Sequence, residues 1–277
     1  MIKAKSLSFN YPDGTEALRD INLEVRDGEF LALMGANGSG KTTLLKLALG
    51  LLNPTSGRIA LGEREFPSLK DKEVFKHIGM IFQDPNDQLF AATVGQDVSF
   101  GVANLGLRPA EVSDRVDNAM RMVGISGLFN KAIHTLSFGQ KRRAAIAGVL
   151  AMSPKIILLD EPTSGLDPHG VSVIMRLLCK LNKENQITMV MATHDVELVP
   201  IFCDRIVIME QGRIMKEGTP QEIFSDATTI RKAKLRLPRI AHLMEVLQKE
   251  DGLALSEVPL TIDAARRELL KLVKKQT

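Results

Sequence analysis

Residues 35–43 constrain this chain more than any other stretch, because Gly-Ala-Asn-Gly-Ser-Gly-Lys-Thr-Thr matches the pattern G-x-x-x-x-G-K-[ST]. An apolar run typical of a short buried strand, Phe30–Met34, precedes it, and Leu44–Leu49 continues with apolar residues at helical spacing. Glycines in such a turn let successive N–H groups point at one anion, and the following helix begins with its positive dipole end. The sequence therefore predicts a site for nucleotide phosphates.

The residue types in this phosphate loop (Gly35–Thr43) suit separate parts of that task. We expect Lys41 to reach the β- and γ-phosphates and the hydroxyl of Thr42 to bind Mg²⁺. A glycine-rich turn without a ligand is the alternative, but the strand before it and the helix after it favour the phosphate site. The candidate nucleotide-binding residues of the loop are Gly35, Asn37, Gly38, Ser39, Gly40, Lys41, Thr42 and Thr43.

Two acidic residues end a second apolar run. Residues 155–161 read Lys-Ile-Ile-Leu-Leu-Asp-Glu, which is typical of a parallel strand buried on both faces of a sheet. Ligands of such sheets bind beyond the carboxyl ends of the strands. We expect Asp160 to hold Mg²⁺ through water and Glu161 to polarise an attacking water, with two solvated surface acids as the alternative interpretation.

Two further residues are candidates because of their position. The apolar run Ile187–His194 predicts another buried strand, which brings His194 to the same sheet edge as Asp160 and favours γ-phosphate contact over a structural role. Tyr11, the only tyrosine in the chain, precedes the turn Pro12-Asp13-Gly14. Its position leaves packing and stacking on adenine both open.

The remaining patterns predict an α/β chain with a helical insert. Residues 1–30 alternate as antiparallel strands do, whereas residues from about 96 to 152 follow helical spacing. Within the insert, Ser137 is a candidate N-cap and Gly139 leaves N–H groups uncovered at the start of a helix. By itself this pattern predicts only a capped helix.

Composition sets the outer bounds. With 44% hydrophobic and 25% charged residues, the chain is globular and not disordered. No uninterrupted apolar stretch approaches the roughly 20 residues that span a bilayer, and the start, Met1–Lys5, does not resemble a secretory segment. Cys179 and Cys203 have no metal-ligand spacing and are interpreted as two buried thiols in a reducing cytoplasm. The basic C-terminal region is interpreted as a solvated helical appendage.

Taken in order, these motifs resemble the ATPase subunit of an ATP-binding-cassette (ABC) transporter. The resemblance covers about residues 1–224 and implies a P-loop NTPase fold with an antiparallel β subdomain and a helical lobe at about 84–152. It divides the chain into an ATPase domain, 1–225, and a small helical C-terminal extension, 226–277. The motifs that carry it are Tyr11, Gly35–Thr43, Gln83, Leu136–Gln140, Ile156–Glu161, Ser164–Asp167 and His194.

The resemblance also implies a mechanism with ATP and Mg²⁺. Two subunits close head to tail, and each ATP lies between one phosphate loop and the signature segment (Leu136–Gln140) of the other subunit. Tyr11 is then expected to stack on adenine, and Gln83 to sense Mg²⁺ and the γ-phosphate. The roles implied for the remaining residues are phosphate contact across the dimer for Ser137, Gly139 and Gln140, communication across the dimer for Asp167, and γ-phosphate and water contact for His194. The signature segment departs from the usual Leu-Ser-Gly-Gly-Gln at Phe138, which puts the local fit of the closed interface in doubt.

A narrower resemblance is to the ATPases of energy-coupling factor importers, above all for cobalt or nickel. Residues 82–90, Val94 and residues 97–101 carry it, together with residues 11–15 and 235–238. It implies a peripheral subunit on the cytoplasmic face of the cell membrane, bound to a transmembrane coupling protein and substrate-specific membrane subunits. It favours a homodimer, which residues 226–277 help to hold together.

Two other readings remain open from the sequence. One is a shared vitamin importer in which two different ATPases pair. The other is a soluble ABC-type ATPase that acts on DNA or ribosomes. Only about 125 residues separate Gly35 from Asp160, without sustained heptads, and the chain has a single cassette. We therefore expect no nucleic-acid partner, and a P-loop kinase would leave the signature segment and His194 unexplained.

Overall fold

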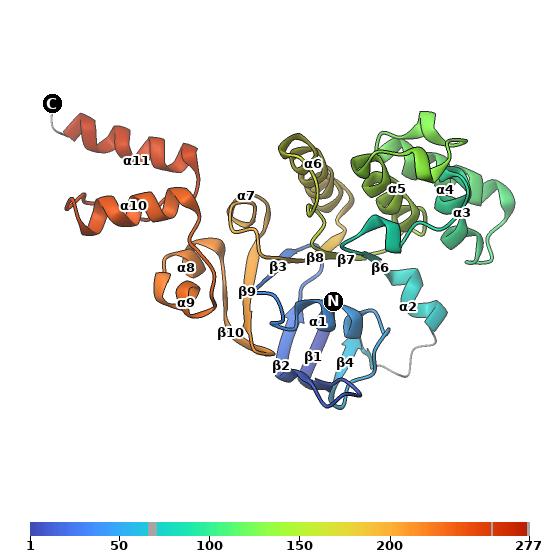
Figure 1. The fold of residues 1–277 in the computed structure, drawn as a ribbon, viewed down its shortest axis with the longest axis horizontal. Coiled ribbons are helices and arrows are strands. Elements are labelled where there is room, and N and C mark those ends of the chain that lie inside the picture. Colours follow the sequence, from blue (N-terminus) through green and yellow to red (C-terminus); the bar gives the residue numbers. More distant parts are fainter. Residues whose placement is uncertain (66–70, 256, 276–277) are drawn as a thin grey trace.

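The protein is described by a computed structural model that covers residues 1–65, 71–255 and 257–275. Two β-sheets face each other across the helix α1 (Lys41–Ala48) (Figure 1). The four-stranded antiparallel sheet has the order β2-β1-β4-β5, and the six-stranded mixed sheet has the order β10-β9-β3-β8-β7-β6. The strands are β1 (Ile2–Asn10), β2 (Glu16–Val25), β3 (Phe30–Met34), β4 (Ser56–Leu61), β5 (Arg64–Glu65), β6 (Ile78–Ile81), β7 (Ile156–Asp160), β8 (Thr188–Thr193), β9 (Arg205–Glu210) and β10 (Arg213–Gly218). The predicted α/β class is confirmed.

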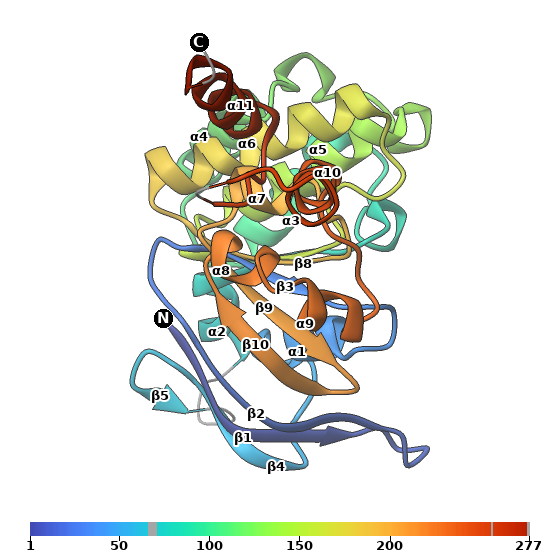
Figure 2. The same cartoon turned by 90° about the vertical axis from the view of Figure 1, so that its left-hand side faces the viewer.

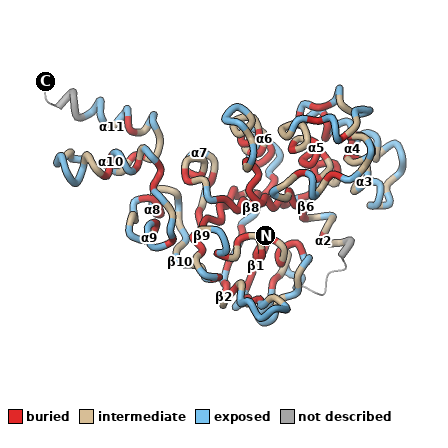
Figure 3. The backbone as a smooth tube through the Cα atoms, viewed as in Figure 1, coloured by how far each residue is buried: buried red, intermediate tan, exposed pale blue. Residues whose placement is uncertain are grey.

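The six-stranded sheet brings the predicted site together. Strands β3, β7 and β8 are buried at every residue, and β8 pairs in parallel with both β3 and β7. Figure 3 shows this sheet as the most continuously buried part of the molecule. Gly35, Glu161 and His194 directly follow the last residues of β3, β7 and β8. Because parallel strands end at a common edge, residues far apart in sequence meet there.

The antiparallel sheet is half-buried, as its alternating pattern predicts. Along β1 the buried residues face α1 and pack with those of the second sheet, while the intervening residues are more exposed. This arrangement leaves Tyr11, just after β1, beside the phosphate loop. The turn at Pro12–Gly14 then reverses the chain into β2.

A helical lobe lies at one end of the six-stranded sheet (Figure 1). Its helices share the apolar core on the face of the sheet opposite α1, and α5 packs so closely on β6 that a Cβ at Gly79 would lie 2.3 Å from Cγ1 of Val149. Helices occupy most of the region from about residue 96 to 152, where the sequence predicts helical spacing. They and the neighbouring helices are α2 (Asp71–His77), η1 (Pro85–Asp87), α3 (Val94–Ala103), α4 (Pro109–Met122), η2 (Ser126–Leu128), η3 (Ile133–Thr135), α5 (Phe138–Ala151), α6 (Pro168–Asn185) and α7 (Val199–Phe202).

The C-terminal helices differ in how they are packed. Ile230 and Ala233, in and after α9, are buried in the same core as the sheet, whereas Leu243 in α10 and Ile262 in α11 are exposed. Figures 1 and 2 show α10 and α11 projecting from the end of the molecule opposite the helical lobe. Residues 256, 276 and 277 of the predicted extension lie outside the described residues. The helices are α8 (Pro220–Phe224), α9 (Ala227–Lys232), α10 (Arg239–Lys249) and α11 (Ile262–Lys275).

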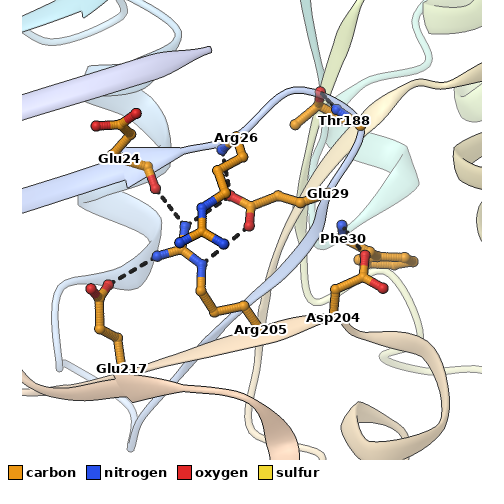
Figure 4. Close-up of polar contacts among 9 residues, drawn as sticks. Glu24, Arg26, Glu29, Phe30, Thr188, Asp204, Arg205 and Glu217 are labelled. Carbon is orange, nitrogen blue, oxygen red and sulfur yellow. Dashed lines mark hydrogen bonds and ion pairs between the residues drawn. The ribbon is translucent and has the colours of Figure 1, made fainter.

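A polar cluster holds the sheet together at the edge opposite the phosphate loop (Figure 4). Arg205, at the start of β9, donates to the buried carboxylate of Glu29 at 2.8 and 3.1 Å, and to Glu217 at 3.0 Å. Asp204 accepts the N–H of Phe30 at 2.9 Å. These bonds tie the turn between β2 and β3 to the start of β9.

Two findings bear on the bounds set by composition. No helix among the described residues is long and apolar enough to cross a bilayer. The interpretation of two buried thiols is wrong for one of them, because Cys203 is buried but Cys179 is only half-buried. Leu178 lies on the buried face of α6, and the next residue, Cys179, lies to one side of that face and is therefore only partly covered. Burial raises the pKa of Cys203 well above its ordinary value.

Candidate functional site

The phosphate loop has the backbone that its glycines predict. Gly38 and Gly40 have φ angles of 78° and 101°, in the left-handed region that side chains with a Cβ disfavour. Gly40 directly precedes α1, whose first N–H groups therefore face the loop. Gly35 is required for another reason, since a Cβ there would lie 2.3 Å from the carbonyl oxygen of Met209.

Lys41 is buried and lies along the loop. Its Nζ donates to the carbonyl oxygens of Gly35 at 2.8 Å and Ala36 at 3.0 Å. Burial lowers the pKa of Lys41, while the negative charges of Glu161 and Asp160 oppose that shift. The cation is therefore held within the loop, in reach of any anion that the backbone N–H groups bind.

Asp160 and Thr42 form a pair of hard oxygen ligands. The Thr42 hydroxyl donates to Oδ1 of Asp160 at 3.0 Å, although 118 residues separate them. Burial raises the pKa of Asp160, and the Thr42 hydrogen bond and the charge of Lys41 partly offset this. A carboxylate that is desolvated in this way and has a hydroxyl beside it matches the oxygen donors that Mg²⁺ prefers. The residues present therefore fit the predicted cation.

Glu161 and His194 form a second pair. Oε1 of Glu161 lies 2.8 Å from Nδ1 of His194, and the Thr193 hydroxyl lies 3.5 Å from Oε2. The Glu161 side chain is 11% exposed and that of His194 is 63% exposed. Glu161 also has a positive φ of 46°, a conformation that is costly for a non-glycine residue and that concentrates at functional sites. The histidine thus connects a buried carboxylate to solvent at the sheet edge.

Most predicted site residues share one open cleft of about 450 Å³, which we call the nucleotide cleft. Tyr11 lies at its wall, with its hydroxyl 3.0 Å from that of Thr43 and its ring edge-on to Phe9. Gly35 does not line the cleft, because it is buried beneath Ser39. The predicted residues that line the cleft are Tyr11, Asn37, Gly38, Ser39, Gly40, Lys41, Thr42, Thr43, Gln83, Asp160, Glu161 and His194.

The other predicted residues lie in a separate cleft of about 490 Å³, the signature cleft. Ser137 caps α5, accepting the N–H of Gln140, while the Gln140 side chain accepts the N–H of Ser137 at 3.0 Å. Asp167 caps α6 by accepting the N–H of Gly170 at 2.6 Å. Ser137, Gly139, Gln140 and Asp167 all line this cleft, and one chain does not bring them to the phosphate loop.

Sequence reasoning overlooked Arg142. Its guanidinium donates to the carbonyl oxygens of Phe82 and Gln83, although it lies in α5 and those residues precede the helical lobe. The one available signal was its spacing of four residues from Phe138, which places the two on one helix face.

A parallel sheet that gathers a phosphate loop and acidic residues at its carboxyl edge is the architecture of P-loop nucleotide-binding proteins. A family model described as ABC transporter matches residues 18–164 of the chain. The chain therefore belongs to the ABC transporter family.

These relatives span nearly the whole chain. It is 49% identical over 271 residues to the energy-coupling factor transporter ATP-binding protein EcfA2 of Clostridium perfringens, covering 97% of this chain and 95% of that protein. It is 50% identical over 280 residues to EcfA of Methanocaldococcus jannaschii, covering 100% of this chain and 99% of that protein. Within the ABC transporter family, the chain thus belongs to the ATP-binding proteins of energy-coupling factor transporters.

Solved structures confirm the ABC ATPase fold. The structure described as cbiO1 from Clostridium perfringens, part of the ABC transporter complex cbiONQ, superposes with a TM-score of 0.76 at 50% identity and covers 88% of this chain and 98% of that one. An ATP-binding cassette solved as a dimer with ADP and Pi superposes with a TM-score of 0.72 at 33% identity, covering 79% and 99%.

Proposed function

We propose that this protein hydrolyses ATP as the motor subunit of an energy-coupling factor importer. The observation that carries the proposal is the Glu161–His194 pair, 2.8 Å apart, in the same cleft as Lys41 and Asp160. A buried carboxylate beside a phosphate loop is placed to act on the water that attacks a γ-phosphate. Family membership supports ATP as the nucleotide.

The residues divide the reaction between them. Glu161 orients the attacking water and accepts its proton, and His194 holds the carboxylate in place while its exposed ring contacts the γ-phosphate. Lys41 exchanges its loop carbonyls for the β- and γ-phosphates and offsets the charge of the transferring group. Mg²⁺, when bound at Thr42, Asp160 and Gln83, supplies further charge neutralisation on the phosphate oxygens. Tyr11 stacks on the adenine.

A second copy of the chain completes the site. The two clefts of one chain carry complementary halves of the predicted ATP contacts, since the phosphate loop lines one and Ser137 and Gly139 line the other. Head-to-tail pairing places the signature cleft of each copy over the nucleotide cleft of its partner, and Asp167 then lies at the interface. The solved cassette described as a dimer bound to ADP and Pi supports the pairing of two copies. We favour a homodimer, in which residues 226–277 help to hold the two copies together.

The partners are a transmembrane coupling protein and substrate-specific membrane subunits, which place the dimer on the cytoplasmic face of the cell membrane. Phe90 is the last residue of the Gln83 segment (Phe82–Phe90), and Phe100 lies in α3. Their aromatic rings are exposed and pack edge to face, with centroids 4.8 Å apart. They offer an apolar contact for the coupling protein. Cobalt or nickel is the favoured cargo, on the resemblance of residues 82–101 and the relative in cbiONQ.

A shared vitamin importer is the alternative, because relatives numbered EcfA2 and EcfA3 occur in strains of one species. We would purify the chain from its host's membranes and identify all partners by mass spectrometry. Membrane subunits of a cobalt or nickel system without a second ATPase would support the favoured proposal. A vitamin-binding membrane protein with a second ATPase would support the alternative, and soluble partners alone would contradict both.

A further inference from the structure

Arg142 is a fully buried arginine whose partners are main-chain carbonyls. It is 0% exposed, and its two terminal nitrogens donate to the carbonyl oxygens of Phe82 and Gln83. Among the described residues no carboxylate forms an ion pair with Arg142, and its Nε has no hydrogen-bond partner. Burial lowers the pKa of Arg142, and the negative charge of Asp84 offsets only part of this cost, so the orientation of the guanidinium depends mainly on the two carbonyl groups.

The surroundings of Arg142 are built to keep the guanidinium in one orientation. The ring of Phe138, one helical turn earlier in α5, lies 5.6 Å from its Cζ atom, in the range of a cation–π contact. That ring also closes on the turn before α6, since a Cβ at Gly165 would lie 3.0 Å from it. Beside them Lys141 donates to the side chain of Asn86 at 2.8 Å. The first turns of α5 therefore bind two points of the segment that follows β6.

We propose that Arg142 is a positioning residue. Together with the ring of Phe138, which covers its guanidinium, Arg142 joins Gln83 and the signature segment into one rigid unit. The planar guanidinium donates to two successive carbonyls, so it sets the direction of the Gln83 backbone as well as its distance from α5. Ser137 caps the same helix. Any rotation of the helical lobe then moves Gln83 in its own nucleotide cleft and Ser137 at the partner's nucleotide together. The inference rests on the role proposed for Gln83 in ATP hydrolysis.

Phe138 acquires a role from the same geometry. The usual glycine of the motif would leave the guanidinium face uncovered, whereas the phenylalanine covers it and packs on the turn at Gly165. Phe138 thus strengthens the connection between Gln83 and the signature segment within one chain. Phe138→Leu, which keeps apolar bulk and removes the aromatic face, should speed hydrogen exchange over residues 82–90 less than Arg142→Met does.

The test compares Arg142→Met with Arg205→Met in the full-length chain. Both side chains are little exposed and donate to main-chain or carboxylate oxygens, but Arg205 lies at the start of β9, in the polar cluster of Figure 4, and does not contact the segment 82–90. Hydrogen exchange over residues 82–90 and steady-state ATP hydrolysis are measured below the unfolding temperature of each variant. Arg142→Met should speed exchange over 82–90 and lower kcat by about tenfold or more, with ATP affinity within about twofold of the unmodified chain. Arg205→Met should lower the melting temperature and leave the hydrogen exchange over 82–90 and the kcat unchanged.

A double-mutant cycle with Gln83→Ala separates positioning from general damage. If Arg142 acts through Gln83, Arg142→Met should lower kcat little further once Gln83 is alanine. Unchanged exchange over 82–90 in Arg142→Met, or independent additive losses in the cycle, would overturn the inference. If Gln83→Ala alone keeps full activity, the role proposed for Gln83 is wrong, and the exchange result still decides whether Arg142 holds the segment. Should Arg142→Met not fold, Arg142→Lys keeps the charge without the planar fork and serves the same comparison.

Discussion

Nδ1 of His194 lies 2.8 Å from Oε1 of Glu161, although 33 residues separate them in the chain. The contact forms because β7 and β8 are parallel neighbours, so the residues that follow them leave the sheet side by side. The main-chain N–H of Glu161 also donates to the carbonyl oxygen of Ala192 at 3.0 Å, which extends the pairing beyond β7. This relationship places a carboxylate, held on two sides, at the edge of the nucleotide cleft.

Glu161→Gln should bind ATP normally, but its rate of hydrolysis should fall by about a hundredfold or more, because the amide cannot accept a proton from water. Single-turnover hydrolysis with separate measurement of ATP binding checks this. Glu184→Gln, at an exposed position on α6, is the matched control and should hydrolyse ATP at the unmodified rate. Turnover of Glu161→Gln near that rate would remove Glu161 from its proposed role.

Lys41→Ala should weaken ATP binding by roughly 10- to 100-fold, because a charge-assisted hydrogen bond to phosphate contributes about 1.5–3 kcal/mol. Isothermal titration calorimetry with ATP measures the change in Kd. Lys180→Ala, which removes a lysine of similar charge from the exposed face of α6, should leave the affinity unchanged. An unaltered Kd in Lys41→Ala would count against the phosphate site.

Asp160→Asn should raise the free energy of unfolding at pH 7 without nucleotide, because burial raises the pKa of Asp160 in the folded chain above its ordinary 3.8. Between pH 3.8 and the pKa of the folded chain, the unfolded chain loses this proton and the folded chain keeps it, so a rising pH favours unfolding. The penalty is absent below about pH 3.8 and grows as the pH rises through the folded pKa.

Urea unfolding of Asp160→Asn at pH 7 and at successively lower pH measures the difference. The gain over the unmodified chain should shrink as the pH approaches 3.8. Asp117→Asn, on the exposed face of α4, should produce no such pattern. A stability loss for Asp160→Asn at pH 7 would show that the carboxylate stabilises the fold.

Gly35→Ala should distort the phosphate loop, because its Cβ would lie 2.3 Å from the Met209 carbonyl oxygen and 2.6 Å from Oγ of Ser39. Overpacking of this kind costs about 1–3 kcal/mol, and we expect ATP affinity to fall with stability. Thermal unfolding and nucleotide titration measure both. Gly127→Ala meets nothing within 4 Å and should change neither, so equal behaviour of the two variants would refute the steric argument.

The sequence alone was sufficient wherever the signal lies in neighbouring residues. The phosphate loop, the apolar strand that ends in Asp160 and Glu161, and the cap at Ser137 are local patterns, and the described structure has the predicted elements at each. Local patterns suffice there because backbone angles, dipoles and caps depend on residues within one or two turns. The order of these motifs along the chain is enough to indicate the family.

Only the tertiary structure decided how those patterns combine. It pairs Glu161 with His194, assigns Ser137 and Asp167 to a cleft apart from the phosphate loop, and buries Arg142 against carbonyl oxygens from another element. Local residue spacing does not specify these contacts, because each depends on which strands are neighbours and on how α5 packs against the sheet. Sequence determined the parts of the site, and the packing of the strands and helices determined which parts meet.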